Sequence, residues 1–267
     1  MAIWYAVRSL VMTALAELAQ QLRAMHHASE PLVLPNAWDA ATARSVVEAG
    51  FAAVATTSSG VSAALGYADG EHTPPDEMFS AVGRIARVVP DVPVTADIES
   101  GYGLSPDEVV RRLLEAGAVG CNLEDTDHRA APGSHTLVDA STQQQRLSAV
   151  KAAAKARGVE LVLNARTDVF LGPSPSVDEA IRRARLYLEA GADCIFPIGA
   201  PDEATIATLV RDIPGPVNVI PGFRSAPPIG KLRELGVRRI SYAGRLFRAM
   251  MLDQQRRLAG LKEWRDF

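Results

Sequence analysis

Short apolar runs alternate with longer amphipathic segments along almost the whole chain, and this alternation limits the possible folds more than any other feature. Eight runs rich in Val, Ile and Ala lie at 33–37, 52–57, 94–98, 120–125, 161–167, 194–199, 217–221 and 240–244. Apolar residues recur at helical spacing between them, as in 106–116, 142–157, 177–190 and 202–212. Strands that are apolar on successive residues need cover on both faces, which a parallel barrel ringed by helices provides. The pattern therefore predicts a single α/β domain with a (β/α)8 (TIM) barrel.

Glycines mark the ends of the predicted helices at a regular position. The segments EAGF, EAGA, EAGA and ELGV occupy 48–51, 115–118, 189–192 and 234–237. Because glycine accepts the left-handed backbone of a helix end, each segment indicates a helix that stops before a buried strand. An open doubly wound sheet is the alternative, but no G-x-G-x-x-G follows the first strand. We predict one catalytic barrel over 13–267 with an N-terminal helix, and interpret 1–12 as an N-terminal extension with Met12 as an alternative start.

Composition excludes several classes of function. The chain has 28 basic and 31 acidic residues and a net charge of −3, which argues against nucleic-acid binding. Both cysteines, Cys121 and Cys194, fall inside apolar runs, so a disulfide scaffold or a cysteine zinc module is disfavoured. No apolar run approaches the roughly 20 residues of a membrane-spanning helix, and the N-terminus does not resemble a signal peptide. We therefore expect a cytoplasmic protein whose function comes from a local site.

Acidic residues gather where two neighbouring strands are predicted to end. Asp97 and Glu99 finish the third run and share one face, while Glu124 finishes the fourth. Barrel enzymes carry their active sites at the carboxyl ends of the strands, so these three carboxylates should converge there. They would repel each other unless a cation lies between them. Oxygen ligands without His or Cys favour Mg²⁺ or Mn²⁺.

Two further strand ends add polar groups to this region. Arg166 follows the fifth run and could bind a substrate carboxylate, although an ion pair with Glu124 competes with that role. More generally, Glu124 or Asp125 could pair with Arg166 or Arg129, or cap the next helix, instead of binding metal. The segment 56–60 after the second run, TTSSG, provides hydroxyls and backbone N–H groups for an oxyanion.

The other reactive residue types give weaker signals. Every lysine lies in a predicted helix or in the C-terminal tail, which disfavours Schiff-base and pyridoxal phosphate enzymes. His26 and His27 are predicted to lie on a solvated helix face, whereas His72, His128 and His135 fall in predicted loops near the site.

Two pairs of residues are interpreted as structural. Cys121 and Cys194 are predicted to be small core residues, and Gly222 and Gly244 to be turn glycines. A phosphate-binding barrel isomerase is the alternative that would place an anion at these two glycines.

Several motifs together resemble one known family, the isocitrate lyase and phosphoenolpyruvate mutase superfamily. They are LPNAWD at 34–39, TSSG at 57–60, LGYAD at 65–69, DIESGYG at 97–103, NLED at 122–125 and NARTD at 164–168. The resemblance extends from about residue 32 to about residue 250. It implies a (β/α)8 barrel that binds Mg²⁺ and acts on 2-oxo or 2-hydroxy carboxylates through an enolate-like species.

The resemblance also implies roles for individual residues. Asp97, Glu99 and Glu124 take the positions of the metal-site carboxylates, and Asp69 lies near metal and substrate. The residues expected to bind the 2-oxo acid are Ser59, Gly60, Val61, Arg166 and Asn218. The family usually forms tetramers built from dimers that exchange a C-terminal helix. The stretch 245–264 is long enough for this, with Phe247, Met250, Met251 and Leu258 available for a partner.

The sequence departs from the family at two places. Lyases of the family carry Lys-x-Cys-Gly-His on the loop after the fourth strand, whereas this loop reads DTDHRAAPGSH at 125–135. A standard isocitrate or methylisocitrate lyase is therefore not expected, and His128 or Arg129 becomes the proton carrier on a loop, 126–137, that closes over the site. Ile198 also stands where the lyases and the mutase have a polar residue.

These observations predict a Mg²⁺-dependent lyase or hydrolase that makes or breaks a C–C or P–C bond beside a small 2-oxo acid, with an oxaloacetate-like substrate. Arg166, Asp69 and His128 are its predicted catalytic residues. The alternatives are a barrel that binds a metabolite without turnover, as a sensor or scaffold, and a phosphonate mutase or hydrolase.

Overall fold

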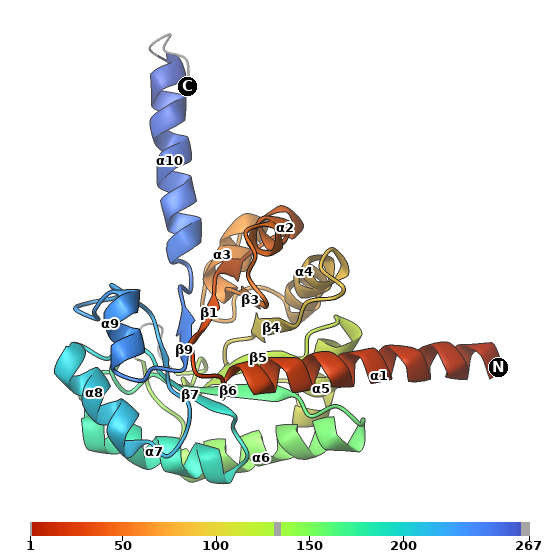
Figure 1. The fold of residues 1–267 in the computed structure, drawn as a ribbon, viewed down its shortest axis with the longest axis horizontal. Coiled ribbons are helices and arrows are strands. Elements are labelled where there is room, and N and C mark those ends of the chain that lie inside the picture. Colours follow the sequence, from red (N-terminus) through yellow and green to blue (C-terminus); the bar gives the residue numbers. More distant parts are fainter. Residues whose placement is uncertain (1, 131–134, 263–267) are drawn as a thin grey trace.

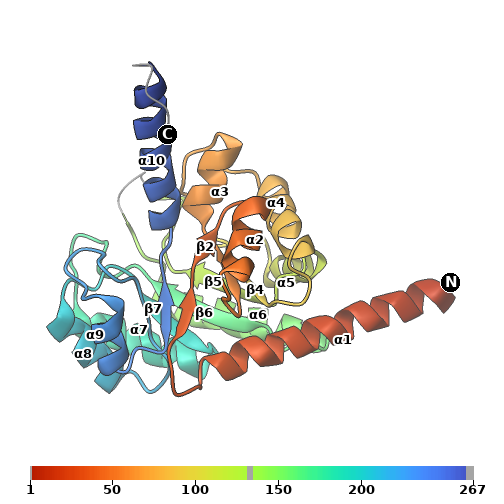
Figure 2. The same ribbon diagram turned by 45° about the horizontal axis from the view of Figure 1, so that its top comes forward.

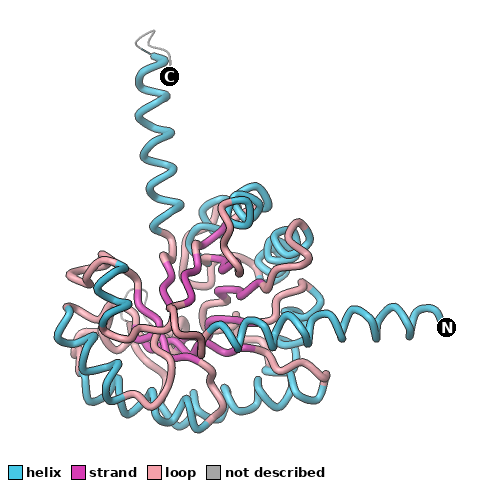
Figure 3. Tube along the Cα trace, in the orientation of Figure 1, coloured by secondary structure: helices cyan, strands magenta, loops and turns pink. Residues whose placement is uncertain are grey.

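The protein is a ring of parallel strands surrounded by helices (Figures 1 and 3). A computed structural model describes residues 2–130 and 135–262. The strands are β1 (Leu32–Leu34), β2 (Asn36–Ala37), β3 (Val54–Thr56), β4 (Val94–Asp97), β5 (Gly120–Glu124), β6 (Val162–Thr167), β7 (Cys194–Pro197), β8 (Asn218–Val219) and β9 (Arg239–Ser241). The helices are α1 (Ala2–Met25), α2 (Ala40–Glu48), α3 (Ser58–Leu65), α4 (Pro75–Arg87), α5 (Pro106–Glu115), α6 (Ala140–Ala156), α7 (Val177–Glu189), α8 (Glu203–Asp212), α9 (Ile229–Glu234) and α10 (Arg245–Lys262).

Strand pairing confirms the predicted barrel class. Strands β2 to β7 pair in sequence order, and β1, β9 and β8 form a second parallel sheet. The two sheets meet where Ile195 bridges Val217, and again where β1 continues into β2. The predicted first strand, 33–37, is split between β1 and β2 at Pro35, which has no backbone N–H to donate. The pairings thus pass all the way around the ring.

The predicted helix ends are confirmed in detail. Gly117 and Gly191 have φ angles of 82° and 94°, so they adopt the left-handed conformation that ends α5 and α7. The side chains of Ser105, Ser176 and Asp202 accept hydrogen bonds from the backbone at the first turns of α5, α7 and α8. Local sequence signals therefore define the boundaries of each repeating unit.

The barrel interior holds a polar layer as well as apolar side chains. Arg239 is fully buried and donates to Asn122 Oδ1 at 3.2 Å, as Asn164 does at 2.8 Å. The prediction that His26 is solvated is wrong: it is 1% exposed, its Nδ1 lies 2.8 Å from Leu22 O, and its Nε2 lies 3.3 Å from Arg239 Nη1. The reason is that the last turn of α1 packs under the barrel.

Helices α1 and α10 extend away from the ring (Figures 1 and 2). The predicted boundary between 12 and 13 falls inside α1, which continues across it. No residue of α10 is buried, and its exposed apolar side chains are Met250, Met251, Leu252, Leu258 and Leu261. Phe247, at its start, instead packs edge-on against Trp38 with ring centroids 5.2 Å apart. None of the described helices is long and apolar enough to cross a membrane.

Asp193 attaches three elements to one another just before β7. Its Oδ1 accepts a hydrogen bond from Arg23 of α1 at 2.7 Å, and its Oδ2 accepts from Lys151 of α6 at 2.9 Å. The backbone N–H of Leu163 also donates to Oδ2, at 2.8 Å. The carboxylate is 10% exposed, so it is largely shielded from water.

We predict that Asp193→Ala lowers the free energy of unfolding by about 3 kcal/mol, because it leaves two cations and a buried N–H without their shared acceptor. Chemical denaturation monitored by circular dichroism measures the change. Asp212→Ala removes a half-buried partner of the exposed Arg211 and serves as the control, for which we expect little effect. Equal stability of the two variants would contradict the role of Asp193.

Candidate active site

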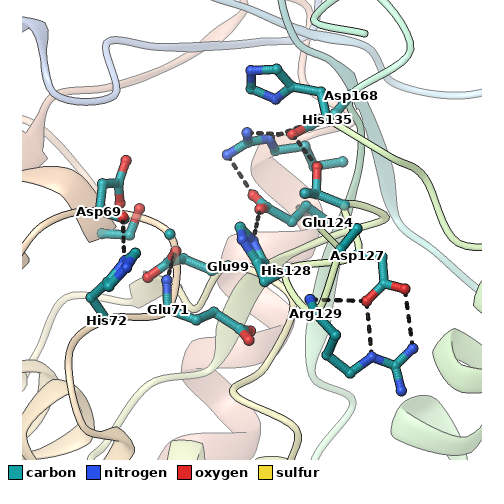
Figure 4. A pocket seen from close by; sticks show the side chains of 15 residues that line it. Asp69, Glu71, His72, Glu99, Glu124, Asp127, His128, Arg129, His135 and Asp168 are labelled. Carbon is teal, nitrogen blue, oxygen red and sulfur yellow. Dashed lines mark hydrogen bonds and ion pairs between the residues drawn. The ribbon is translucent and has the colours of Figure 1, made fainter. Parts of the chain in front are cut away.

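A cavity of about 550 Å³ opens at the carboxyl ends of β4, β5 and β6 (Figure 4). The loop between α3 and α4 closes one side of it, and the loops after β5 and β6 close the other. Its described lining consists of Ser58, Asp69, Gly70, Glu71, His72, Glu99, Glu124, Thr126, Asp127, His128, Arg129, Ala130, His135, Arg166 and Asp168. The place is the one predicted for the site of a barrel enzyme.

Asp97 ends β4, is not part of the described cavity lining, and is held by Ser58, which is part of it. Its Oδ2 accepts hydrogen bonds from the backbone N–H of Ser58 at 3.1 Å and from the Ser58 hydroxyl at 3.0 Å. Its own N–H donates to Thr56 Oγ1 at 2.9 Å. Its Oδ1 is buried and has no hydrogen-bond partner among the described residues. A buried carboxylate oxygen left in this way is available to a ligand or an ion.

Glu99 is held in a conformation that most residues avoid. Its φ is 51°, and Glu71 and Tyr102, which contact it, have φ angles of 61° and 57°. Glu99 Oε2 accepts from the Glu71 N–H at 2.6 Å, and Oε1 accepts from the Tyr102 hydroxyl at 2.9 Å. Burial and the negative charges of Asp69 and Glu124 raise the pKa of Glu99 to about 8, against these hydrogen bonds. The carboxylate therefore needs a proton or a cation at neutral pH.

Arg166 joins the ends of β5 and β6 through two carboxylates. Its Nε and Nη2 donate to Asp168 at 2.6 and 2.7 Å, and its Nη1 lies 2.6 Å from Glu124 Oε2. Of the alternatives weighed for this residue, the ion pair with Glu124 is thus present. Burial raises the pKa of Glu124 to about 7, although the charge of Arg166 opposes the shift. Thr126 Oγ1 donates to Asp168 at 2.7 Å and completes the group.

His128 reaches the same carboxylate from the loop after β5. Its Nε2 lies 2.7 Å from Glu124 Oε1 (Figure 4). Burial by itself lowers the pKa of His128, but the hydrogen bond and charge of Glu124 outweigh it and raise the pKa to about 9. Arg129 pairs with Asp127 at 2.9 Å and not with the cluster. His128 is therefore a protonated group on the wall of the cavity at neutral pH.

Asp69 and Asp125 occupy different surroundings. Burial, and next the charge of Asp97, raises the pKa of Asp69, which lines the cavity as expected. Asp125 points away from it, where Oδ2 accepts from the Tyr187 hydroxyl at 2.7 Å and from Arg183 at 3.0 Å.

The loop expected to close the site is paired at its base, where Thr126 bridges Leu137, and its residues 131–134 lie outside the described residues.

Four predicted substrate-binding residues are not part of the described cavity lining. Ser59 contacts Thr57, and Gly60 packs against Thr57 and Trp38. Val61 is fully buried, and Asn218 exchanges hydrogen bonds with Ser241 inside the barrel.

Three other positions singled out in the sequence are likewise outside the described lining. Ile198 packs with Phe196 and Ile220 in a separate apolar cluster. Gly222 lies near the Arg245 side chain, and Gly244 packs against Ser59.

Sequence reasoning assigned no role to Glu71, Asp168 or Thr126. Asp168 stands inside the NARTD motif, two residues after Arg166 on a strand end, and that spacing could have indicated their contact. Glu71 gave no such signal, because its role depends on the loop between α3 and α4 folding back toward Glu99.

The residues present suit a hard cation held by carboxylates. The unpartnered Oδ1 of Asp97 and the raised pKa of Glu99 both show negative charge without a counter-ion. No three His, Cys, Asp or Glu side chains within 2–130 and 135–262 enclose an ion by themselves. Mg²⁺ commonly keeps several of its waters and uses one or two carboxylates.

Comparison with known proteins identifies the family. The model of the family "phosphoenolpyruvate phosphomutase" matches residues 22–262. An uncharacterised protein of Mycobacterium tuberculosis is 34% identical over 220 residues, which are 81% of this chain and 79% of the relative. A protein of Corynebacterium glutamicum named "Probable 2-methylisocitrate lyase 2" is 32% identical over 88% of this chain and 78% of its own length.

A solved structure gives the same result. The crystal structure of 2,3-dimethylmalate lyase, a member of the phosphoenolpyruvate mutase/isocitrate lyase superfamily, has a TM-score of 0.83 and 26% identity. The match covers 92% of this chain and 85% of that one. The chain belongs to this superfamily of lyases and mutases and has its barrel fold.

We predict that Glu124→Gln lowers the pKa of His128 from about 9 to below its ordinary value near 6.5, because only the burial effect would remain large. In the wild type the raised pKa stabilises the fold fully below about pH 6.5, and this contribution is lost as the pH rises through 9. NMR titration of the His128 ring in metal-free protein measures both values. Glu160→Gln, at an exposed residue that pairs with Arg23 of α1, is the control, and an unshifted His128 in Glu124→Gln would disprove the pairing.

Proposed function

We propose that this protein is a Mg²⁺-dependent enzyme that cleaves or forms a C–C or P–C bond beside a small 2-oxo carboxylate, acting as a lyase or hydrolase on an oxaloacetate-like substrate. The observation that carries the proposal is the group of Asp69, Asp97, Glu99 and Glu124 beside Arg166 at the barrel mouth. Family membership supports bond cleavage or formation as the reaction class, because the named relatives are lyases and mutases.

Asp97, Glu99 and Glu124 are the residues that would hold the ion. When bound, Mg²⁺ polarises a 2-oxo group and stabilises negative charge developing on its oxygen. The chain itself keeps these carboxylates in place through Ser58, Tyr102 and the Glu71 backbone, so little reorganisation is needed.

Substrate orientation and proton transfer fall to the two cationic groups. Arg166 is fixed by Asp168 and Glu124, and in this position it presents a rigid positive charge to a substrate carboxylate. His128 carries a proton at Nε2 on the cavity wall. The contact of Nε2 with Glu124 Oε1 controls how readily His128 gives this proton up.

The loop after β5 supports hydrolysis or an unusual lyase over the reaction of the methylisocitrate lyases. Its sequence over 125–135 contains no cysteine, and its described residue that contacts Glu124 through a titratable side chain is His128. A P–C bond reaction remains the second candidate, supported by the family model that matches the chain.

We predict that Asp97→Ala and Glu124→Ala each lower metal-dependent turnover by about 100-fold or more while the protein stays folded, because each removes charge that must face the ion. NMR-monitored incubation with Mg²⁺ and oxaloacetate, methylisocitrate, isocitrate, phosphonopyruvate or dimethylmalate identifies the substrate and the bond. Chelator should stop the conversion, and Glu160→Ala should leave it unchanged. Unchanged turnover in either active-site variant would refute the assignment, and ligand binding without turnover would favour a sensor or scaffold.

We further propose that the protein forms a homotetramer, a dimer of dimers, in which α10 packs on a neighbouring copy. The exposed Met250, Met251, Leu252, Leu258 and Leu261 on a helix without buried residues support this. Light scattering coupled to size-exclusion chromatography should give four copies for the full chain. Met251→Glu with Leu258→Glu should reduce that mass, and a monomeric wild type would contradict the proposal.

A further inference from the structure

A second cavity, of about 290 Å³, lies beside the first, under the loop after β5. Its described lining is Glu71, Ser100, Gly103, Leu104, Glu124, Thr126, Asp127, His128, Arg129, Val138, Thr142, Gln143 and Arg146. Glu71, Glu124, Thr126, Asp127, His128 and Arg129 border both cavities. The two spaces are therefore neighbours that share one wall, and the second is lined in addition by α6.

Arg146 of α6 lines this second cavity. The described residues provide no hydrogen bond or ion pair for its guanidinium, and its Nη2 is buried without a partner. The group packs directly on Gly101, where a Cβ atom would lie only 2.6 Å from Nη2. Burial lowers the pKa of Arg146, as expected for a desolvated charge without a partner. Such a charge is costly unless an anion accompanies it.

The other described arginines of the two cavities, and His128, already have carboxylate partners. Arg166 pairs with Glu124 and Asp168, and Arg129 pairs with Asp127. His128 pairs with Glu124. Arg146 is the exception among them.

The carboxylate of Glu71, whose charge acts on Arg146, does not fill this role. Glu71 uses its Oε1 to accept hydrogen bonds from the Ser100 hydroxyl and the Tyr102 N–H, both at 2.6 Å. It makes no ion pair with Arg146, although its charge acts on the guanidinium from farther away. An acceptor for Arg146 has to come from outside the described residues.

We infer that the second cavity is a binding site for a carboxylate or phosphate group, with Arg146 as its cationic ligand. A volume of about 290 Å³ accommodates a group of this size. The group could belong to a distal arm of the substrate that passes His128, or to a separate small anion. Only the first source rests on the function proposed above.

The position of Arg146 also places this site next to the carboxylate cluster. Gly101, on which the guanidinium packs, lies between Glu99 and Tyr102 in the loop after β4. A group bound to Arg146 would therefore settle against the loop that holds Glu99 in its left-handed conformation.

Arg146→Gln tests the inference, with Lys155→Gln, an exposed residue of the same helix, as the matched control. Inorganic phosphate alone, without metal or substrate, should bind the wild type and the control saturably in calorimetry. Loss of a charge-assisted hydrogen bond should weaken that binding about ten-fold or more in Arg146→Gln. Arg146→Lys, which keeps the charge, should retain part of the affinity.

Steady-state kinetics distinguish the two sources. If the group belongs to the substrate, Arg146→Gln raises KM about ten-fold or more for the substrate with the additional anionic arm. In that case kcat is little changed, and a substrate without the arm is unaffected. If a separate anion binds, the phosphate affinity falls and both KM values stay the same.

Two results would overturn the inference, and a second measurement tests it if the variant does not fold. Equal phosphate binding by wild type and Arg146→Gln, or no binding by either, overturns it when KM is also unchanged. Should Arg146→Gln fail to fold, the Nε–Hε resonance of Arg146 in the wild type decides, because phosphate must shift it. A protein without turnover on the whole panel would refute the proposed function and leave the phosphate measurement valid.

Discussion

The rest of the site depends on the ion pairs of Arg166, which offset part of the negative charge gathered at the barrel mouth. Among the described residues, six carboxylates line the main cavity, and mutual repulsion would disperse them without compensation: Asp69, Glu71, Glu99, Glu124, Asp127 and Asp168. Arg166 pairs with two of them and offsets one negative charge, and because Glu124 and Arg166 are paired residues of β5 and β6, the ion pair joins adjacent strands. The remaining negative charge on Asp97 and Glu99 is what an incoming cation would meet.

A hydrogen-bond network behind Arg166 connects the end of β6 to helix α7. The N–H of Asp168 donates to Asp125 Oδ1 at 2.9 Å, and Asp125 is in turn held by Tyr187 and Arg183 of α7. Arg183 also donates to the carbonyl of Val138, at the end of the loop after β5. The carboxylate of Asp125, which supports the end of β6, therefore also anchors the base of the loop that brings His128 to Glu124.

Strain at the opposite side of the cavity is balanced by hydrogen bonds. Glu71, Glu99 and Tyr102 all have positive φ angles, and each costs conformational energy of about 1 kcal/mol or more. Four hydrogen bonds join them to one another and to Ser100, which keeps the Glu99 carboxylate in place before any ligand arrives. Burial and the negative charges of Asp69 and Glu124 nevertheless raise the pKa of this carboxylate to about 8.

Periodicity and chain punctuation were enough to predict the barrel, the order of its strands and the strand ends that carry Asp97, Glu99, Glu124 and Arg166, because these are local properties of the chain. Which side chains contact one another is not a local property of the chain. Whether Arg166 faces Glu124, Asp168 or open space depends on strand register, and Glu71, Arg146 and His26 acquire their surroundings from segments distant in sequence. Burial and the summed field of neighbouring charges also set the pKa values of Glu99 and His128, and only the tertiary structure brings those charges together.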